Sequence, residues 1–290
     1  MSYQETKTRM IPFLLPLALI ASLISSSCTE KDKVVSTTPV VSTSDKGWTF
    51  ETTPVFADEF DYVGKPNTAK WGYDVGGGGW GNNEKEFYTA AGANADVSNG
   101  VLTIEARREN MGGMEYTSCR MVTRNKFENT YGRFEAKIKL PTGRGLWPAF
   151  WMLPTDSEYG NWPKSGEIDV MEQVGYEPLK IHQSVHTEAF NHTIGTQKTA
   201  STDVSSATSA FQIYRVDWTP YAVRGYVNDV KVFEFVNSGG YAKWPFDKKF
   251  HMLLNIAVGG NWGGVNGIDN AAFPAQMQVD YVRVYRMIEK

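Results

Sequence analysis

The chain has 290 residues, with 29 Lys and Arg against 32 Asp and Glu, and a formal net charge of -3. This near-balance lacks the basic stripe of a nucleic-acid binder, so we expect no nucleic-acid partner. The length suits one large all-β unit or two smaller domains. No repeat with a period of roughly 20 to 50 residues indicates a solenoid or propeller, so one principal domain is the simpler interpretation.

Residues 1–27 have the layout of an export signal. Lys7 and Arg9 precede an apolar run over 10–24, which is too short to cross a membrane as a helix. Three serines then precede Cys28, an order that resembles the bacterial lipoprotein signal, in which the cysteine is lipidated and becomes the mature N-terminus. We expect lipidation of Cys28 and contact with a membrane only through that anchor. The alternative is an ordinary signal peptide that is cut nearby.

Residues 28–47 are rich in Ser, Thr, Lys and Val and predict a flexible tether. Their charged start, TEKDK, resembles the surface-export signals of Bacteroidota lipoproteins. The expected location is therefore the outer membrane, and the choice between exposure at the cell surface and a periplasmic orientation is left open. All nine tryptophans occur from Trp48 onward, so the folded domain is expected over 48–290. Cys119, the other cysteine of the chain, is expected to be a buried free thiol.

Short segments of alternating hydrophobicity recur along this domain and are bounded by Gly, Pro or Asn. No segment has a sustained apolar period of 3.6 residues, so helices should be few. Many closely spaced strands predict an antiparallel sandwich or barrel, and the pair Asn228-Asp229 predicts a tight hairpin turn. The clearest strand segments are 101–108, 131–140, 213–220, 222–235 and 277–286.

The segment GEIDVME, at 166–172, places three carboxylates on one predicted strand. On a straight strand Glu167 and Asp169 share one face, whereas Glu172 points to the other. A β-bulge, with Met171 as the additional residue, would return Glu172 to the shared face. The two glutamate carboxyls would then lie about 5 Å apart, the separation of a retaining glycosidase. A solvated acidic face is the alternative for any strand of this kind.

Tryptophans surround this segment in the sequence. Indole rings stack on the flat faces of sugars, so Trp147, Trp151 and Trp162 are candidate sugar platforms, with ordinary core packing as the alternative. Trp80 and Trp262 stand in glycine-rich loops, where a large aromatic side chain is more suited to a ligand than to a core. These glycine runs lack the Gly-Lys-Ser/Thr ending of a phosphate loop.

Three histidines, at 182, 186 and 192, raise the question of a metal site. His182 and His186 share a strand face, but no third ligand has a recognisable zinc spacing. We therefore expect a histidine that hydrogen-bonds to substrate or to a catalytic acid, with His186 as the best candidate. No Gly-x-Ser-x-Gly elbow supports a serine hydrolase.

Several ordered motifs between Trp48 and Tyr285 together resemble glycoside hydrolase family 16, in its laminarinase-like branch: GWGNNEKEFYT, GRGLWPAFWMLP, GEIDVMEQVG, VHTEAFNH, and LLNIAVGGNWGG followed by FPAQMQVDYVRVY. The resemblance implies a β-jelly-roll, in which two antiparallel sheets stack and the concave one carries an open substrate cleft. It implies that Glu167 is the nucleophile and Glu172 the acid/base. Asp169 would orient the nucleophile, and Met171 would be the insertion of the bulged branch.

The same resemblance implies the other site residues. Trp147, Trp151 and Trp162 would be platforms on the donor side of the cleft, and Asn82, Glu84 and Trp262 would line it. No cofactor is required for catalysis. Many family members carry a structural calcium on the convex face, and the matching positions here are Glu59, Gly100 and Asp280.

The expected function is a monomeric, retaining endo-β-glucanase that acts on β-1,3-glucan (laminarin), on mixed-linkage β-1,3/1,4-glucan, or on both. An endo-hydrolase of a galactan, as in agarases and carrageenases, would have a similar site. Arg144 is the only basic residue of GRGLWPAF, which favours an uncharged glucan over a sulfated galactan. The sequence is also compatible with a noncatalytic surface lipoprotein that binds glycans, and with a transglycosylase that shares the covalent intermediate.

Overall fold

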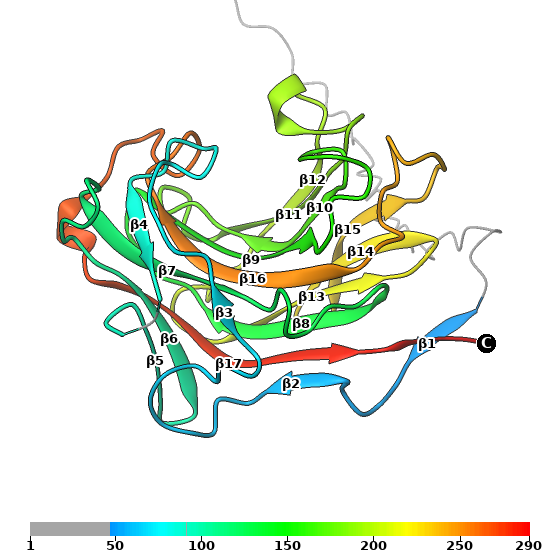
Figure 1. Cartoon of the computed structure of the whole chain (residues 1–290), viewed down its shortest axis with the longest axis horizontal. Helices are drawn as coiled ribbons and strands as arrows, with labels where there is room; N and C mark the ends of the chain where they lie inside the picture. The colour runs from blue at the N-terminus through cyan, green and yellow to red at the C-terminus, as the bar shows by residue number, and fades with distance from the viewer. Residues whose placement is uncertain (1–46, 91) are drawn as a thin grey trace, which may run out of the picture. The chain divides into compact units, whose positions relative to one another are not determined.

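The computed structural model describes residues 47–90 and 92–290 (Figure 1). The predicted signal at 1–27, the lipidation site Cys28 and the tether up to residue 46 lie outside the described residues. Within the described part of the chain, no helix is long and apolar enough to span a membrane.

Two stacked sheets make up the domain, and a separate ribbon pairs its two ends. Figure 1 shows the cleft sheet above the outer sheet, with its concave face turned away from the outer sheet. The cleft sheet has the strand order β12 (Lys198–Asp203), β11 (Lys180–His186), β10 (Glu167–Glu172), β9 (Leu146–Pro154), β16 (Phe250–Val258), β7 (Tyr116–Val122) and β3 (Gly72–Tyr73), with β4 (Glu86–Thr89) also on β7.

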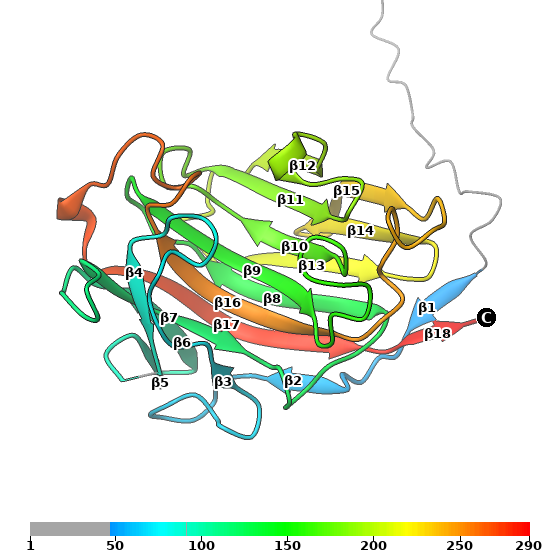
Figure 2. The same cartoon turned by 45° about the horizontal axis from the view of Figure 1, so that its top comes forward.

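The outer sheet has the same number of strands. Its order is β15 (Val230–Val236), β14 (Ala222–Val227), β13 (Gln212–Trp218), β8 (Gly132–Lys139), β17 (Ala275–Tyr285), β6 (Val101–Ala106) and β5 (Ala95–Ser98), with β2 (Phe56–Asp58) also on β17. The ribbon joins β1 (Trp48–Phe50) to β18 (Met287–Glu289), near the end of the chain marked C in Figure 2.

These pairings are antiparallel except for β4 with β7, which is parallel. The predicted sandwich of two antiparallel sheets is therefore present. Helical structure within 47–90 and 92–290 is limited to two single 3₁₀ turns, at His192–Ile194 and Asn270–Ala272, as the missing 3.6-residue period predicted.

Residue alternation explains which sides of the strands meet in the core. On β8, Phe134, Ala136 and Ile138 are fully buried between the sheets, and the residues between them are partly exposed. In contrast, every residue of β7 and of β16 is buried. One face of these central strands packs on the outer sheet, and the other contributes Arg120, Asn255 and Ala257 to the lining of the cleft.

The predicted hairpin turn and the predicted burial of Cys119 are confirmed. Asn228 and Asp229 have φ values of 47° and 65° and join β14 to β15, as a two-residue hairpin turn with both central residues left-handed requires. The Asn228 amide also receives a hydrogen bond from the Ile213 backbone N–H, at 2.9 Å. Cys119 is fully buried in β7 and forms no disulfide with a described residue.

Candidate active site

A β-bulge interrupts β10 between its carboxylates. Against β9, Asp169 pairs with Trp151 and Met171 pairs with Phe150, so three residues of β10 span two of its neighbour. The predicted bulge is confirmed, but its unpaired residue is different. Met171 has a Cα partner and Val170 has none, because the extra residue enters directly after Asp169. Our assignment of Met171 as the additional residue was therefore wrong in register by one position.

The bulge sorts the side chains of β10 between the two faces of the sheet. Ile168, Val170 and Met171 are all fully buried in the core. Because Val170 and Met171 both point into the core, the alternation of side chains shifts by one residue, and Glu172 returns to the cleft face with Glu167 and Asp169. These three acids line one cleft of about 310 Å³.

Each glutamate has its own tryptophan donor. The Trp162 indole N–H donates to Oε2 of Glu167 at 2.8 Å, and the Trp147 indole N–H donates to Oε1 of Glu172 at 3.0 Å. Trp147 lies on β9, where side chains alternate between the cleft and the core. Trp162 comes from the loop before β10. The predicted platforms thus also hold the carboxyl groups in place.

Trp151, the third predicted platform, also lines the cleft. Its indole N–H donates to Oδ1 of Asn255 at 2.7 Å and not to a glutamate. Its ring lies 4.8 Å from the Arg120 guanidinium, which stacks at the same distance on Trp80. The Arg120 guanidinium therefore lies between the rings of Trp80 and Trp151.

His186 lies opposite Glu167 on the neighbouring strand β11 and is buried, in contact with two of the predicted catalytic carboxyls. Its Nε2 is 3.3 Å from Oδ2 of Asp169 and 3.8 Å from Oε1 of Glu167. One ligand atom from each of these three residues lies within 4.8 Å of the others, a geometry that could hold a metal ion. The Trp162 indole already occupies one oxygen of Glu167, and a contact between imidazole and carboxylates accounts for the cluster without a metal.

Burial raises the pKa of all three carboxyl groups. It raises the pKa of Glu167 to about 8, and the neighbouring Asp169 charge adds to this, while His186 and the Trp162 donor act in the opposite direction. Burial raises the pKa of Asp169 to about 7. The pKa of Glu172 is raised well above its usual value, first by burial and then by the charges of Asp169 and Glu167. Closely packed, buried carboxyls cannot all be ionised, so at least one of the three keeps a proton.

The other predicted cleft residues are also near this centre. Asn82 and Glu84 line the cleft, and the Asn82 amide donates to Oε1 of Glu84 at 3.3 Å. The Tyr88 hydroxyl donates to the other oxygen of Glu84 at 3.1 Å. Trp262 stands against the edge of Trp147, with ring centroids 5.4 Å apart. It supports a platform rather than lining the cavity itself.

Sequence reasoning missed Arg120, Asn255 and His192, which also line the cleft. Arg120 and Asn255 are polar residues beside apolar ones in the segments CRMV and LLNIAV, and that contrast was a usable signal. His192 was noticed only as a possible metal ligand. It packs against the Trp162 ring, with centroids 5.0 Å apart.

The residues proposed for calcium already have other partners. Both carboxylate oxygens of Glu59 accept hydrogen bonds of 2.8 Å from Arg283, which lowers the Glu59 pKa, and Asp280 lies 2.6 Å from Nζ of Lys137. Gly100 lies at the turn between β5 and β6, with φ of 74°. A calcium ion would have to displace two cations, so this set does not fit the ion as arranged, and calcium stays an untested prediction.

Comparison with known proteins agrees with this site. A family model described as glycosyl hydrolases family 16 matches residues 82–283. A β-glucanase of Rhodothermus marinus is 53% identical over 244 residues, which are 81% of this chain and 85% of that enzyme. The X-ray structure of the laminarinase from Rhodothermus marinus superposes with a TM-score of 0.81 at 52% identity, covering 83% of this chain and 99% of that one.

A third similar protein is a non-specific endo-β-1,3(4)-glucanase from family GH16, crystallised as a variant with an oligosaccharide at its active site. It superposes with a TM-score of 0.79 at 40% identity and covers 83% of this chain and 99% of that one. The laminarinase structures share the two-sheet jelly-roll described above. The chain therefore belongs to glycoside hydrolase family 16 and is a glycoside hydrolase.

Proposed function

We propose that this protein is a retaining endo-β-glucanase that hydrolyses β-1,3-glucan and mixed-linkage β-1,3/1,4-glucan. The observation that carries the proposal is the bulge in β10, which places Glu167 and Glu172 on one cleft face, each with its own indole donor. Similar proteins support the substrate class. They include a β-glucanase, a laminarinase, and a glucanase that holds 1,3-β-D-cellobiosyl-glucose at its active site.

In the first step, the Glu167 carboxylate attacks the anomeric carbon while Glu172 gives its proton to the glycosidic oxygen. The bond between that carbon and the leaving oxygen breaks, and a covalent glycosyl-enzyme forms. In the second step Glu172, now ionised, takes a proton from water. The resulting hydroxide attacks the same carbon and releases Glu167, so the configuration is retained and no cofactor is used.

The site supports this division of roles. Glu172 keeps its proton because it is buried and the charges of both Asp169 and Glu167 raise its pKa, whereas among charges only that of Asp169 raises the pKa of Glu167. The indole N–H of Trp162 and the imidazole of His186 favour the ionised form of Glu167, and Trp147 and His186 act in the same direction on Glu172, so the charges of the neighbouring carboxylates distinguish the two glutamates. Asp169 lies between the glutamates on the strand, with Oδ2 3.3 Å from His186, and thereby links the nucleophile to the buried histidine.

The charge of the cleft favours a neutral polysaccharide. Arg120 is the only Lys or Arg among the described residues that line it, and it is paired with Asp74 at 3.2 Å and covered by two indole rings. Arg144 instead donates to the Asn266 carbonyl at 3.2 Å, outside this lining. A sulfated galactan would find little uncompensated positive charge here.

Digestion of purified laminarin, mixed-linkage glucan, curdlan and agarose in parallel tests the proposal. We expect oligosaccharides of mixed size from laminarin and mixed-linkage glucan, and none from agarose. Glu167→Gln and Glu172→Gln should abolish hydrolysis while circular dichroism remains unchanged. Full activity of either variant would contradict the catalytic roles assigned to Glu167 and Glu172. Release of fragments from agarose alone would favour a galactan hydrolase.

We also propose that the protein is exported, lipidated at Cys28 and held at the outer membrane as a monomer. The layout of residues 1–28 supports this, as does the suitability of a tethered endo-enzyme for the first cuts in a large external polymer. Labelled palmitate should enter the protein but not a Cys28→Ala variant. Protease treatment of intact cells separates surface from periplasmic orientation, and sedimentation of the soluble domain tests the monomer.

A further inference from the structure

Gln183 lies on β11 directly beside the bulge of β10. On either side of it the ladder is regular, with Ser184 opposite Asp169 and His182 opposite Glu172. Gln183 therefore faces the interval that contains Val170 and Met171. Its side chain points away from the cleft and is fully buried between the sheets, where a polar group requires a hydrogen-bond partner.

The Gln183 amide supplies a hydrogen bond that the bulge needs. Its Nε2 donates to the Val170 carbonyl at 2.8 Å, and Val170 is the residue without a Cα partner on β9. An unpaired buried carbonyl would cost about 1–3 kcal/mol. The side chain of Gln183 thus replaces the ladder contact that the extra residue interrupts.

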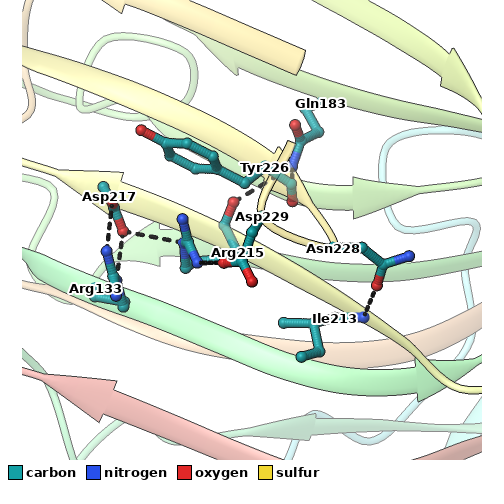
Figure 3. Close-up of polar contacts among 8 residues, drawn as sticks. All are labelled: Arg133, Gln183, Ile213, Arg215, Asp217, Tyr226, Asn228 and Asp229. Atoms are coloured by element: carbon teal, nitrogen blue, oxygen red, sulfur yellow. Dashed lines mark hydrogen bonds and ion pairs between the residues drawn. The ribbon is translucent and has the colours of Figure 1, made fainter. Parts of the chain in front are cut away.

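The same amide nitrogen reaches the outer sheet. It lies 3.3 Å from the Tyr226 carbonyl on β14 and 3.5 Å from the Arg215 carbonyl on β13 (Figure 3). Because three carbonyl oxygens surround this position, only the nitrogen end of the amide is compatible with it. The Gln183 side chain therefore bridges the bulge and the outer sheet through its hydrogen bonds.

Gly225 on β14 leaves room for the Gln183 side chain. A Cβ atom at Gly225 would lie 2.4 Å from Oε1 and 2.7 Å from Cδ of Gln183. Its φ lies outside the left-handed region that demands glycine, so the need for space explains the residue. Any larger residue at this position must displace the Gln183 amide.

We propose that Gln183 is a positioning residue for catalysis, because it holds the bulge that sets the place of Glu172 relative to Glu167. The inference rests on the proposed function, in which Glu172 protonates the leaving group. Glu172 follows the bulge directly, so a shift in the Val170 carbonyl is transmitted to it through a single intervening residue. Misplacement of a catalytic group by about 1 Å can cost roughly 100-fold in rate.

Two substrates distinguish misplacement of the acid from general damage. Laminarin needs a proton on its leaving oxygen, whereas 2,4-dinitrophenyl β-laminaribioside releases a phenolate that leaves without one. For Gln183→Met, which keeps the length but removes the donor, we expect kcat/KM to fall roughly 10- to 100-fold on laminarin and less than about 3-fold on the aryl substrate. Gly225→Ala, which displaces the amide from the other sheet, should lower the same ratio.

Ile181→Val is the matched control, because Ile181 is also fully buried on β11 but contributes no donor. It should leave the ratio of the two kcat/KM values unchanged. An unchanged ratio in Gln183→Met would overturn the proposal, whether both activities fall together or neither falls. If Gln183→Met does not fold, the ratio in Gly225→Ala decides in the same way.

Glu172→Ala in the same assay separates this proposal from the proposed function. If Glu172→Ala loses laminarin hydrolysis selectively and Gln183→Met does not, only the positioning role is wrong. If Glu172→Ala hydrolyses laminarin normally, the acid/base assignment fails, and the positioning role fails with it.

Discussion

The indole N–H of Trp147 donates to Oε1 of Glu172 at 3.0 Å, and this donor lowers the pKa of the proposed acid/base. Trp147→Phe removes the donor but keeps an aromatic platform. A hydrogen bond to an ionised group contributes about 1.5–3 kcal/mol and one to a neutral group about 0.5–1.5 kcal/mol, so the ionised form loses about 1 kcal/mol more. At 1.36 kcal/mol per pKa unit, the Glu172 pKa should rise by roughly 0.7.

The pH dependence of kcat/KM on laminarin measures this change, because it reports the essential acid and base of the free enzyme. We expect the alkaline limb, where Glu172 loses its proton, to move to higher pH in Trp147→Phe. The acidic limb, where Glu167 becomes ionised, should stay in place.

Two neighbouring tryptophans provide matched controls. Trp162→Phe removes the 2.8 Å donor to Glu167, so the pKa of the nucleophile should rise and the acidic limb should move to higher pH. Trp151→Phe removes a donor to Asn255 and should leave both limbs in place. If Trp147→Phe moves the alkaline limb to lower pH, or if Trp151→Phe moves it equally, the assigned roles are wrong.

Three further changes test the bulge, the buried charges and the hairpin. Deletion of Val170 or of Met171 should restore plain alternation and keep Glu172 on the face of Glu167 and Asp169, yet laminarin hydrolysis should fall below detection, because the contacts of Glu172, including the Trp147 donor, are arranged around the bulge; retained activity would show that the bulge is dispensable. Burial raises the pKa of Glu167 to about 8 in the folded protein, so between about pH 4.5 and pH 8 the unfolded chain ionises this group while the folded protein keeps it protonated. The unaltered protein therefore loses stability as the pH rises through this range. Glu167→Gln removes that loss and should stabilise the fold increasingly between the two pH values. The gain is at most about 5 kcal/mol, and thermal melts across this range should show no gain at pH 4. Asn228→Ala should lower the free energy of unfolding by about 2 kcal/mol in urea, since it places a Cβ residue without a polar side chain at φ 47° and removes the hydrogen bond from Ile213, whereas Asn228→Gly should cost less.

The sequence by itself determined the class of fold and the centre of the site. Period-two alternation specifies strands with one face in the core, and it predicted an antiparallel sandwich or barrel, of which the family resemblance selected the sandwich that the structure shows. The pair Asn228-Asp229 predicted the hairpin turn correctly. The spacing of the carboxylates on β10 predicted the bulge for the same reason, because one extra residue inverts the faces of all that follow. These are local properties of the chain, readable within a few residues.

Only the tertiary structure decided how these elements meet. The register between strands and the packing of one sheet against the other determine three sets of contacts. These are the hydrogen bonds from Trp162 to Glu167 and from Trp147 to Glu172, the stacking of Arg120 between two indoles, and the hydrogen bond from Gln183 to Val170. The same non-local contacts gave Glu59 and Asp280 cationic partners where the resemblance predicted calcium. Contacts of this kind join residues distant in the chain, and no periodicity or spacing along the sequence encodes their distances.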